Sequence, residues 1–181
     1  IIYCQAKPVF LDSNDDYCID AIKIKKFIDE QTFFKNGYTF NKKSHKKIKA
    51  IVVVHLAGWP ADMVKIIELA KKYNLKVIED CAQAHGAIFK KTNCGNFGDF
   101  GCFSLFPAKN LGAMSDAGII TTNKKKYQVV ARSLGNYDRA AALRGPSRKR
   151  ARCPGNLCFY AALSGSLILY WDFIEVFFKG F

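Results

Sequence analysis

Two apolar runs on either side of a helical pattern constrain the fold most strongly. Residues 51–55 are mostly β-branched and end on a histidine, and residues 76–80 are a second apolar run that ends on two carboxylates. Between them four apolar residues recur at helical spacing: Met63, Ile66, Ile67 and Ala70. A strand, a helix and a strand within about thirty residues form a βαβ unit, with parallel strands and a right-handed crossover. The sequence therefore predicts an α/β fold with a mostly parallel sheet.

The other predicted elements follow from local pattern. Residues 7–12 are expected to form a short strand, and an isoleucine stripe over residues 19–30 predicts a helix. Residues 31–48 are polar and lysine-rich, and we expect an exposed loop there. Two further apolar runs with flanking glycines, residues 98–104 and 117–122, predict buried strands.

Polar residues follow the predicted strands at the ends where parallel sheets bind ligands. Ligands of open parallel sheets collect beyond the carboxyl ends of the strands. This rule places His55, Asp80 and the loop after Ser104 on one rim. Asp80, Ser104 and Lys109 supply a carboxylate, a hydroxyl and an amine. Such a set suits a ligand that has a basic ring nitrogen, a phosphate and an aldehyde.

Two ordered motifs make this set specific. Residues 79–86 read Glu-Asp-x-Ala-Gln-x-His-Gly, and residues 103–112 read Phe-Ser-x-x-x-x-Lys-Asn-Leu-Gly. Together with Asp-Ala-Gly at 116–118 they resemble the cofactor site of the DegT/DnrJ/StrS family of pyridoxal-phosphate-dependent nucleotide-sugar aminotransferases, over about residues 7–137. The resemblance implies an aspartate-aminotransferase-like large domain (fold type I), incomplete here, with a mostly parallel sheet and helices on both faces.

The resemblance also implies a role for each residue of the motifs. Lys109 would form the Schiff base with pyridoxal 5'-phosphate and then act as base and acid. Asp80 would hold the proton on the pyridine nitrogen, Gln83 would lie at the ring phenolic oxygen, and Ser104 would donate to the phosphate. The alternatives are a surface position for Lys109, a helix cap for Asp80, and ordinary polar lining for Gln83 and Ser104.

Three further residues are weaker candidates for substrate binding. His55 and Trp59 belong to the predicted rim, although an aromatic residue beside Gly-Pro also suits packing. His85 could contact substrate or form a structural hydrogen bond. No metal site is predicted, because the seven cysteines are odd in number and include no Cys-x-x-Cys pair. The cysteine pattern fits a reducing cytoplasm.

Charge is uneven along the chain. The net charge is +13, and residues 124–181 carry 11 Lys and Arg against 3 Asp and Glu. Lysine clusters without interleaved aromatics favour a solvated surface over nucleic-acid binding in the first 123 residues. The apolar run at 157–171 covers about fifteen residues, whereas a bilayer helix needs about twenty, so a membrane anchor is disfavoured. We expect residues 1–137 to be a partial large domain and the basic, then apolar tail at 138–181 to lie apart from its core.

The resemblance implies transfer of an amino group from an amino acid, glutamate by expectation, to a nucleotide-linked keto-sugar in polysaccharide biosynthesis. The parent enzyme is expected to be a cytoplasmic homodimer. The chain starts at Ile1 in mid-pattern and without Met, so we expect a fragment. Two alternatives stay open: a catalytically inactive remnant of such an enzyme, or a basic or membrane-associating module formed by residues 138–181.

Overall fold

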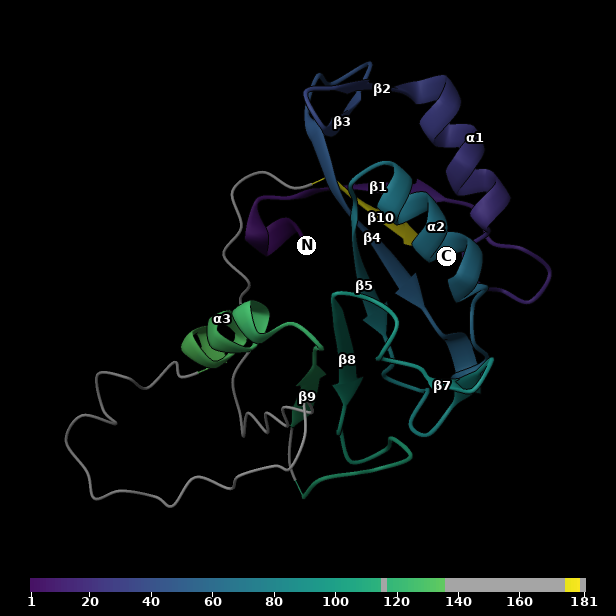
Figure 1. Cartoon of the computed structure of the whole chain (residues 1–181). Coiled ribbons are helices and arrows are strands. Elements are labelled where there is room, and N and C mark those ends of the chain that lie inside the picture. The colour runs from purple at the N-terminus through teal and green to yellow at the C-terminus, as the bar shows by residue number, and fades with distance from the viewer. Residues whose placement is uncertain (115–116, 136–174, 180–181) are drawn as a thin grey trace.

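A six-strand path through one mixed sheet organises the molecule (Figure 1). In the computed structural model, which describes residues 1–114, 117–135 and 175–179, the strand order is β1-β10-β4-β5-β8-β9. The strands are β1 (Lys7–Leu11), β10 (Glu175–Lys179), β4 (Lys47–Val54), β5 (Lys76–Asp80), β8 (Phe100–Ser104) and β9 (Gly118–Thr121). Neighbours are parallel except β9, which runs antiparallel to β8. The predicted parallel pairing of β4 and β5 is confirmed.

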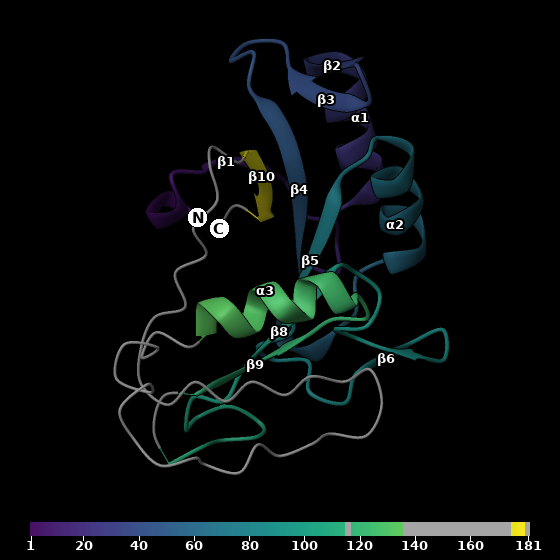
Figure 2. The ribbon, with the colours of Figure 1, turned by 60° about the vertical axis from the view of Figure 1, so that its left-hand side comes forward.

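Helices cover both faces of the sheet, as expected (Figures 1 and 2). α1 (Ala21–Gln31) and α2 (Met63–Lys72) lie on one face. α3 (Lys125–Gly135) lies on the other, where Tyr127 stacks on Phe100 of β8 with ring centroids 4.9 Å apart. The helices α1 and α2 begin at aspartate N-caps, whose side chains accept hydrogen bonds from backbone amides of the first turn.

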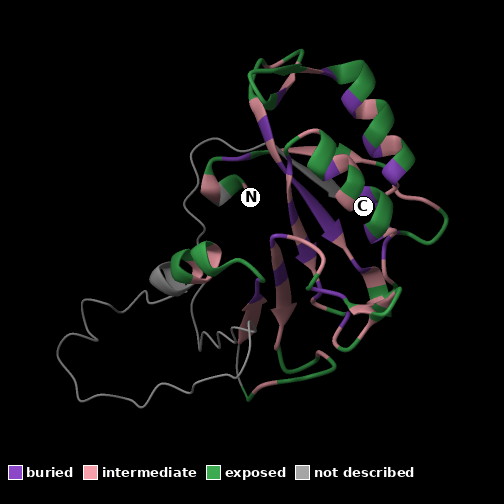
Figure 3. Ribbon diagram, viewed as in Figure 1, coloured by how far each residue is buried: buried purple, intermediate pink, exposed green. Residues whose placement is uncertain are grey.

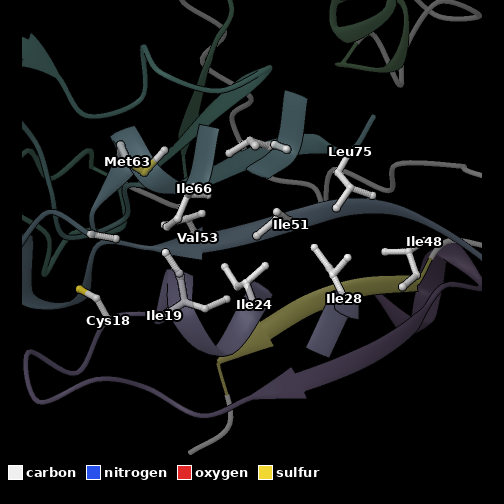
Figure 4. Packing of buried hydrophobic residues seen from close by; sticks show 14 residues of the cluster. Cys18, Ile19, Ile24, Ile28, Ile48, Ile51, Val53, Met63, Ile66 and Leu75 are labelled. Atoms are coloured by element: carbon white, nitrogen blue, oxygen red, sulfur yellow. The ribbon is translucent and has the colours of Figure 1, made fainter. Parts of the chain in front are cut away.

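The main core lies between β4 and the helices α1 and α2. Figure 3 shows buried residues along β4 and exposed residues on the outer sides of both helices. Figure 4 shows the packed side chains, which include Ile51 and Val53 of β4 and Ile24 and Ile28 of α1, together with Met63, Ile66 and others. Ala50 and Val52 are buried on the opposite face. A strand covered on both faces is expected to be apolar throughout, which explains the continuous run in β4.

The prediction of an exposed loop over residues 31–48 is wrong. The first part of this segment is a hairpin of β2 (Thr32–Lys35) and β3 (Tyr38–Asn41), and β3 also pairs with β4. Asn36 and Gly37 form its turn with φ of 51° and 78°. An Asn-Gly pair with both φ values positive is the favoured two-residue hairpin turn, because its twist matches that of the strands. That local signal outweighs the lysine-rich composition.

The tail contributes one described strand. Residues 175–179 form β10 between β1 and β4, parallel to both and with a register shift against β4 between Glu175 and Val176, so these five residues do not follow the expectation that the tail lies apart from the core. Valine and phenylalanine favour a strand at this place. The basic segment and the apolar run at 157–171 lie outside the described residues, so the division after residue 137 stays a prediction. Among the helices described, none has the length and apolar character to cross a bilayer.

Three small elements complete the description. They are η1 (Ile2–Cys4), η2 (Leu56–Gly58) and a hairpin of β6 (Ile88–Phe89) and β7 (Thr92–Asn93). Of these, η2 matters most for the site, because it connects the end of β4 to the loop before α2.

Candidate active site

The carboxyl ends of β5 and β8 bring Asp80 and Ser104 to one face of the sheet. Asp80 lies opposite Cys102 in the parallel register. Ser104 follows Cys102 by two residues, and alternate residues of a strand share a face. The two side chains are therefore offset by roughly 7 Å along the strands. This is the face that α3 covers farther along β8.

Asp80 is partly buried at the last position of β5. Its Oδ1 accepts a hydrogen bond from the Ala82 amide at 3.0 Å, and its carbonyl oxygen accepts one from the His55 amide at 3.0 Å. No other described residue bonds to the remaining carboxylate oxygen. The helix-cap alternative is not met, because the segment between β5 and β6 forms turns and no helix; Oδ1 closes the first of these turns, and the second oxygen can accept from a ligand.

Ser104 and Lys109 border the loop that leaves β8. The Ser104 Oγ accepts a hydrogen bond from the Phe106 amide at 3.2 Å, so its hydroxyl hydrogen remains to be donated elsewhere. The Lys109 amide donates to the Phe106 carbonyl at 2.8 Å, which closes a turn at the lysine. Lys109 is half-buried, whereas Phe106 and Leu111 beside it are exposed.

Gln83 is oriented by the turn after β4. Its Oε1 accepts a hydrogen bond from the Ala57 amide at 3.0 Å. Because the oxygen is engaged, the side-chain NH₂ group is the part left to face a ligand, and it can only donate. The turn is tight: Ala57 has φ of 52°, and a Cβ added to Gly58 would lie 2.9 Å from the Gln83 carbonyl oxygen.

Glu79 is the main polar residue that the sequence did not single out. It is fully buried and points away from the face of Asp80, toward the loop before β8. Its carboxylate accepts hydrogen bonds from the amides of Gly95, Phe97 and Gly98 at 2.7, 2.9 and 2.7 Å. The fourth partner is His55, whose Nε2 lies 3.1 Å from Oε2. The sequence did contain a signal for this site: Glu79 is a charged residue at an inward position of an apolar strand. A charged group is buried only when hydrogen bonds or opposite charges compensate it.

The substrate role predicted for His55 is not supported. The ring is buried, and its two nitrogens bond to Glu79 and to the Ala61 amide, the latter at 3.2 Å from Nδ1. Since Nδ1 accepts the Ala61 hydrogen bond, the proton of the neutral ring is on Nε2. That proton leaves no lone pair on Nε2 for a metal ion, although the ligand atoms of His55, Glu79 and Cys81 lie within 4.8 Å of one another.

The other two candidate substrate contacts lie in different surroundings. Trp59 is 61% exposed at the rim, so its role stays a prediction. Both ring nitrogens of His85 are buried, and neither has a hydrogen-bond partner among the described residues, so the expected structural hydrogen bond is not found there. Its ring lies 5.4 Å from that of Phe103 and lines a cavity of about 320 Å³. Phe103 points to the opposite face of β8 from Ser104, and the cavity also reaches Leu111 in the loop after Ser104.

Burial raises the pKa of three thiols near the ends of β5 and β8: those of Cys81 and Cys94, which are buried, and that of Cys102, which is partly buried. Burial, followed by the charge of Glu79, raises the pKa of Cys94 to about 11. Burial, with Asp80 next, raises the pKa of Cys102 to about 12. Burial also raises the pKa of Cys81 far above its ordinary value. A thiol must ionise to act as a nucleophile, so the raised pKa values disfavour a nucleophilic role for these three cysteines.

Fold and site together define a class of protein. A mostly parallel sheet with helices on both faces, and polar groups at the carboxyl ends of its strands, is the fold type I architecture of pyridoxal-phosphate-dependent aminotransferases. Residues 1–155 match the DegT/DnrJ/EryC1/StrS aminotransferase family, and the chain belongs to this family.

Individual relatives agree with this membership. The chain is 42% identical over 138 residues to UDP-N-acetyl-3-dehydro-alpha-D-glucosamine 3-aminotransferase of Acidithiobacillus ferrooxidans, covering 76% of this chain and 33% of that one. A DegT DnrJ EryC1 StrS aminotransferase from Brucella abortus superposes with a TM-score of 0.66 at 28% identity, covering 87% and 38%. NtdA from Bacillus subtilis with bound cofactor PMP gives 0.50 at 32% identity, covering 66% and 23%. The chain spans about a third of the length of the curated relatives that it matches.

The residues present fit a pyridoxal phosphate group. Asp80 offers a carboxylate oxygen, Gln83 an amide donor, Ser104 a hydroxyl donor and Lys109 an amine, all at the same edge of the sheet. The structure therefore brings the four predicted cofactor contacts to one rim. Asp116, from the third motif, lies outside the described residues.

Proposed function

We propose that this chain carries the cofactor-binding part of a pyridoxal-phosphate-dependent aminotransferase that acts on a nucleotide-linked keto-sugar. The observation that carries the proposal is the placement of Asp80 and Ser104 on one face of neighbouring parallel strands, with Lys109 in the loop that follows. The named activity of the Acidithiobacillus relative supports the substrate class. An amino acid, glutamate in our expectation, is the donor.

Each residue has a defined task in this proposal. Bound pyridoxal phosphate supplies an electron sink and a carrier for the amino group. The Asp80 carboxylate holds a proton at the ring nitrogen, which keeps the ring electron-poor. The Gln83 NH₂ group donates to the ring oxygen and the Ser104 hydroxyl donates to the phosphate. Lys109 Nζ anchors the cofactor, then removes a proton from the donor amino acid and returns one during transfer.

The proposal extends to the assembled protein. Exposed apolar residues flank Lys109, among them Phe106, Leu111 and Met114. Such a patch beside a site suits contact with a second copy, and a homodimer is the arrangement we propose. A cytoplasmic enzyme of polysaccharide biosynthesis is the setting that we propose.

The test is covalent labelling. The chain is joined to the flanking segments of the Acidithiobacillus relative, loaded with pyridoxal phosphate, reduced with borohydride and digested for mass spectrometry. The pyridoxyl label is expected on Lys109 and is lost in Lys109→Ala, whereas the exposed helix lysine variant Lys71→Ala keeps it. Label spread over surface lysines would refute the site.

Activity separates the enzyme from an inactive remnant. In the same fusion, Asp80→Asn is expected to lower turnover by at least about a hundredfold, because a side chain that holds a proton during catalysis typically contributes a factor of that order. The variant should still bind the cofactor. A correctly labelled protein without any transfer of an amino group would favour the remnant.

A further inference from the structure

We propose that Glu79 and His55 form a positioning pair that holds Gln83 in its donor orientation. This inference rests on the proposed function, since it concerns the residue placed at the cofactor ring oxygen. The pair acts through the turn formed by residues 56–61, and neither residue touches the cofactor itself.

The first link is a carboxylate with all its hydrogen bonds satisfied. Glu79 is fully buried and accepts four hydrogen bonds, three from backbone amides and one from His55. The amides belong to the loop that enters β8, so the carboxylate is fixed in place on that side. A group held in this way can orient the imidazole without moving itself, and a buried network of this kind is rigid when every member is paired.

The second link is the imidazole. Nε2 donates to Glu79, and Nδ1 therefore accepts from the Ala61 amide. The ring thus joins the end of β4 to the far end of the turn. The turn closes on itself as well, because the amide of Trp59 donates to the Leu56 carbonyl at 2.9 Å.

The third link reaches Gln83. Ala57, inside the turn, has φ of 52° and donates its amide to the Gln83 Oε1 at 3.0 Å. A positive φ costs a residue with a Cβ about 1 kcal/mol, so the turn needs support from its surroundings to hold this shape. His55 supplies that support at Ala61. When the turn is held, Gln83 presents NH₂ to the ligand; when it relaxes, the amide can rotate and present oxygen instead.

Two substitutions of His55 separate its hydrogen bond to Glu79 from its hydrogen bond to Ala61. Asparagine places an amide oxygen near the position of Nδ1, so His55→Asn keeps the acceptor for Ala61 and loses the donor to Glu79. Glutamine places its amide nitrogen near the position of Nε2, so His55→Gln keeps the donor to Glu79 and loses the acceptor for Ala61. Both variants remove the ring, so they form a matched pair for loss of packing.

The readout is amide hydrogen exchange in the 181-residue chain, which needs no cofactor. In His55→Gln the Ala57 amide is expected to exchange about tenfold faster relative to core amides of α1, the effect of losing roughly one hydrogen bond. In His55→Asn the acceptor for Ala61 is kept but is no longer oriented by Glu79, so a smaller increase of about threefold is expected, and an unchanged ratio would remove Glu79 from the pair. A ¹⁵N spectrum of the parent should show the His55 proton on Nε2.

The inference about Glu79 and His55 can be tested even if a variant does not fold, because one measurement uses the parent protein. A parent protein with the His55 proton on Nδ1 overturns the inference outright, as does an equal change at Ala57 and α1, which would mean a structural role only. In the cofactor-loaded fusion, Gln83→Glu keeps the acceptor for Ala57 but cannot donate, and it should weaken cofactor binding at least tenfold while Lys109 is still labelled. Unchanged affinity there refutes the donor role of Gln83 while leaving the aminotransferase proposal intact.

Discussion

Replacing Glu79 with glutamine tests the buried carboxylate that accepts four hydrogen bonds. The carboxylate has two donors on each oxygen: His55 and the Gly95 amide on Oε2, and the Phe97 and Gly98 amides on Oε1. Glutamine keeps the shape but replaces one oxygen with NH₂. Whichever way the amide turns, its NH₂ group faces two hydrogen-bond donors.

The size of the effect follows from this count. Two hydrogen bonds are lost with their donors left buried, at about 1–3 kcal/mol for each unsatisfied group, and the other two lose a charged acceptor. Removing one partner from a buried charged network costs about 3–5 kcal/mol, which agrees with this sum. A domain is stable by only about 5–15 kcal/mol, so we expect Glu79→Gln to lose a large share of its free energy of unfolding.

Urea unfolding of the 181-residue chain, followed by circular dichroism, measures this loss. Asp80→Asn is the matched control: it makes the same chemical change one residue away, on the other face, where the carboxylate is half-buried and accepts one backbone hydrogen bond. It should cost less than about 1 kcal/mol. If Glu79→Gln and Asp80→Asn destabilise equally, or if Glu79→Gln costs less than about 1 kcal/mol, the assignment of a four-donor buried carboxylate is refuted.

Three further predictions follow from particular positions. Gly101→Ala should lower the free energy of unfolding in urea by about 2–3 kcal/mol, because its Cβ would lie 2.4 Å from the backbone of the preceding loop. Gly118→Ala, with a nearest contact of 3.1 Å, should cost less, and similar values for the two variants would contradict the close approach at Gly101. Gly37→Ala should cost about 1 kcal/mol from backbone strain alone, since its φ is +78° and no atom lies near its Cβ; a neutral effect would contradict the turn geometry. The pKa values of Cys94 and Cys102, raised by burial to about 11 and 12, mean that the unfolded chain releases these protons from about pH 9 while the folded chain does not. Stability should therefore be complete below pH 9 and fall above it by about 1.4 kcal/mol per pH unit for each thiol, and a Cys102→Ala variant that keeps the full slope would contradict this.

The central part of the fold could be predicted because its signals are local and strong. The β-branched run of β4, the helical spacing in α2 and the apolar run of β5 identify a βαβ unit, and the rule for parallel sheets then locates the site at its carboxyl edge. The structure agrees on all of these elements within a few residues.

The remaining features depend on contacts that a single sequence does not display. The hairpin of β2 and β3 had a signal, Asn36-Gly37, which composition concealed. The burial of His55 depends on Glu79, 24 residues later in the chain, and on the backbone of Ala61. The donor orientation of Gln83 depends on the backbone of Ala57 across 26 residues. Such pairings arise from packing between strand ends, so residue types alone could place His55 on the rim but could not show that its ring turns inward.

The neighbouring acids Glu79 and Asp80 have a consequence for how this protein can evolve. They leave one strand on opposite sides, so one carboxylate is used for architecture and the next, in the function that we propose, for chemistry. Because side chains alternate strictly along a strand, an insertion or deletion of one residue in β5 would turn both side chains to the opposite face. Aspartate would then lie on the face of the four donors with too short a side chain, and glutamate on the face at which we propose that the cofactor binds. Apolar residues of β5 can be substituted over time, but the length of the strand cannot change by a single residue without losing both functions.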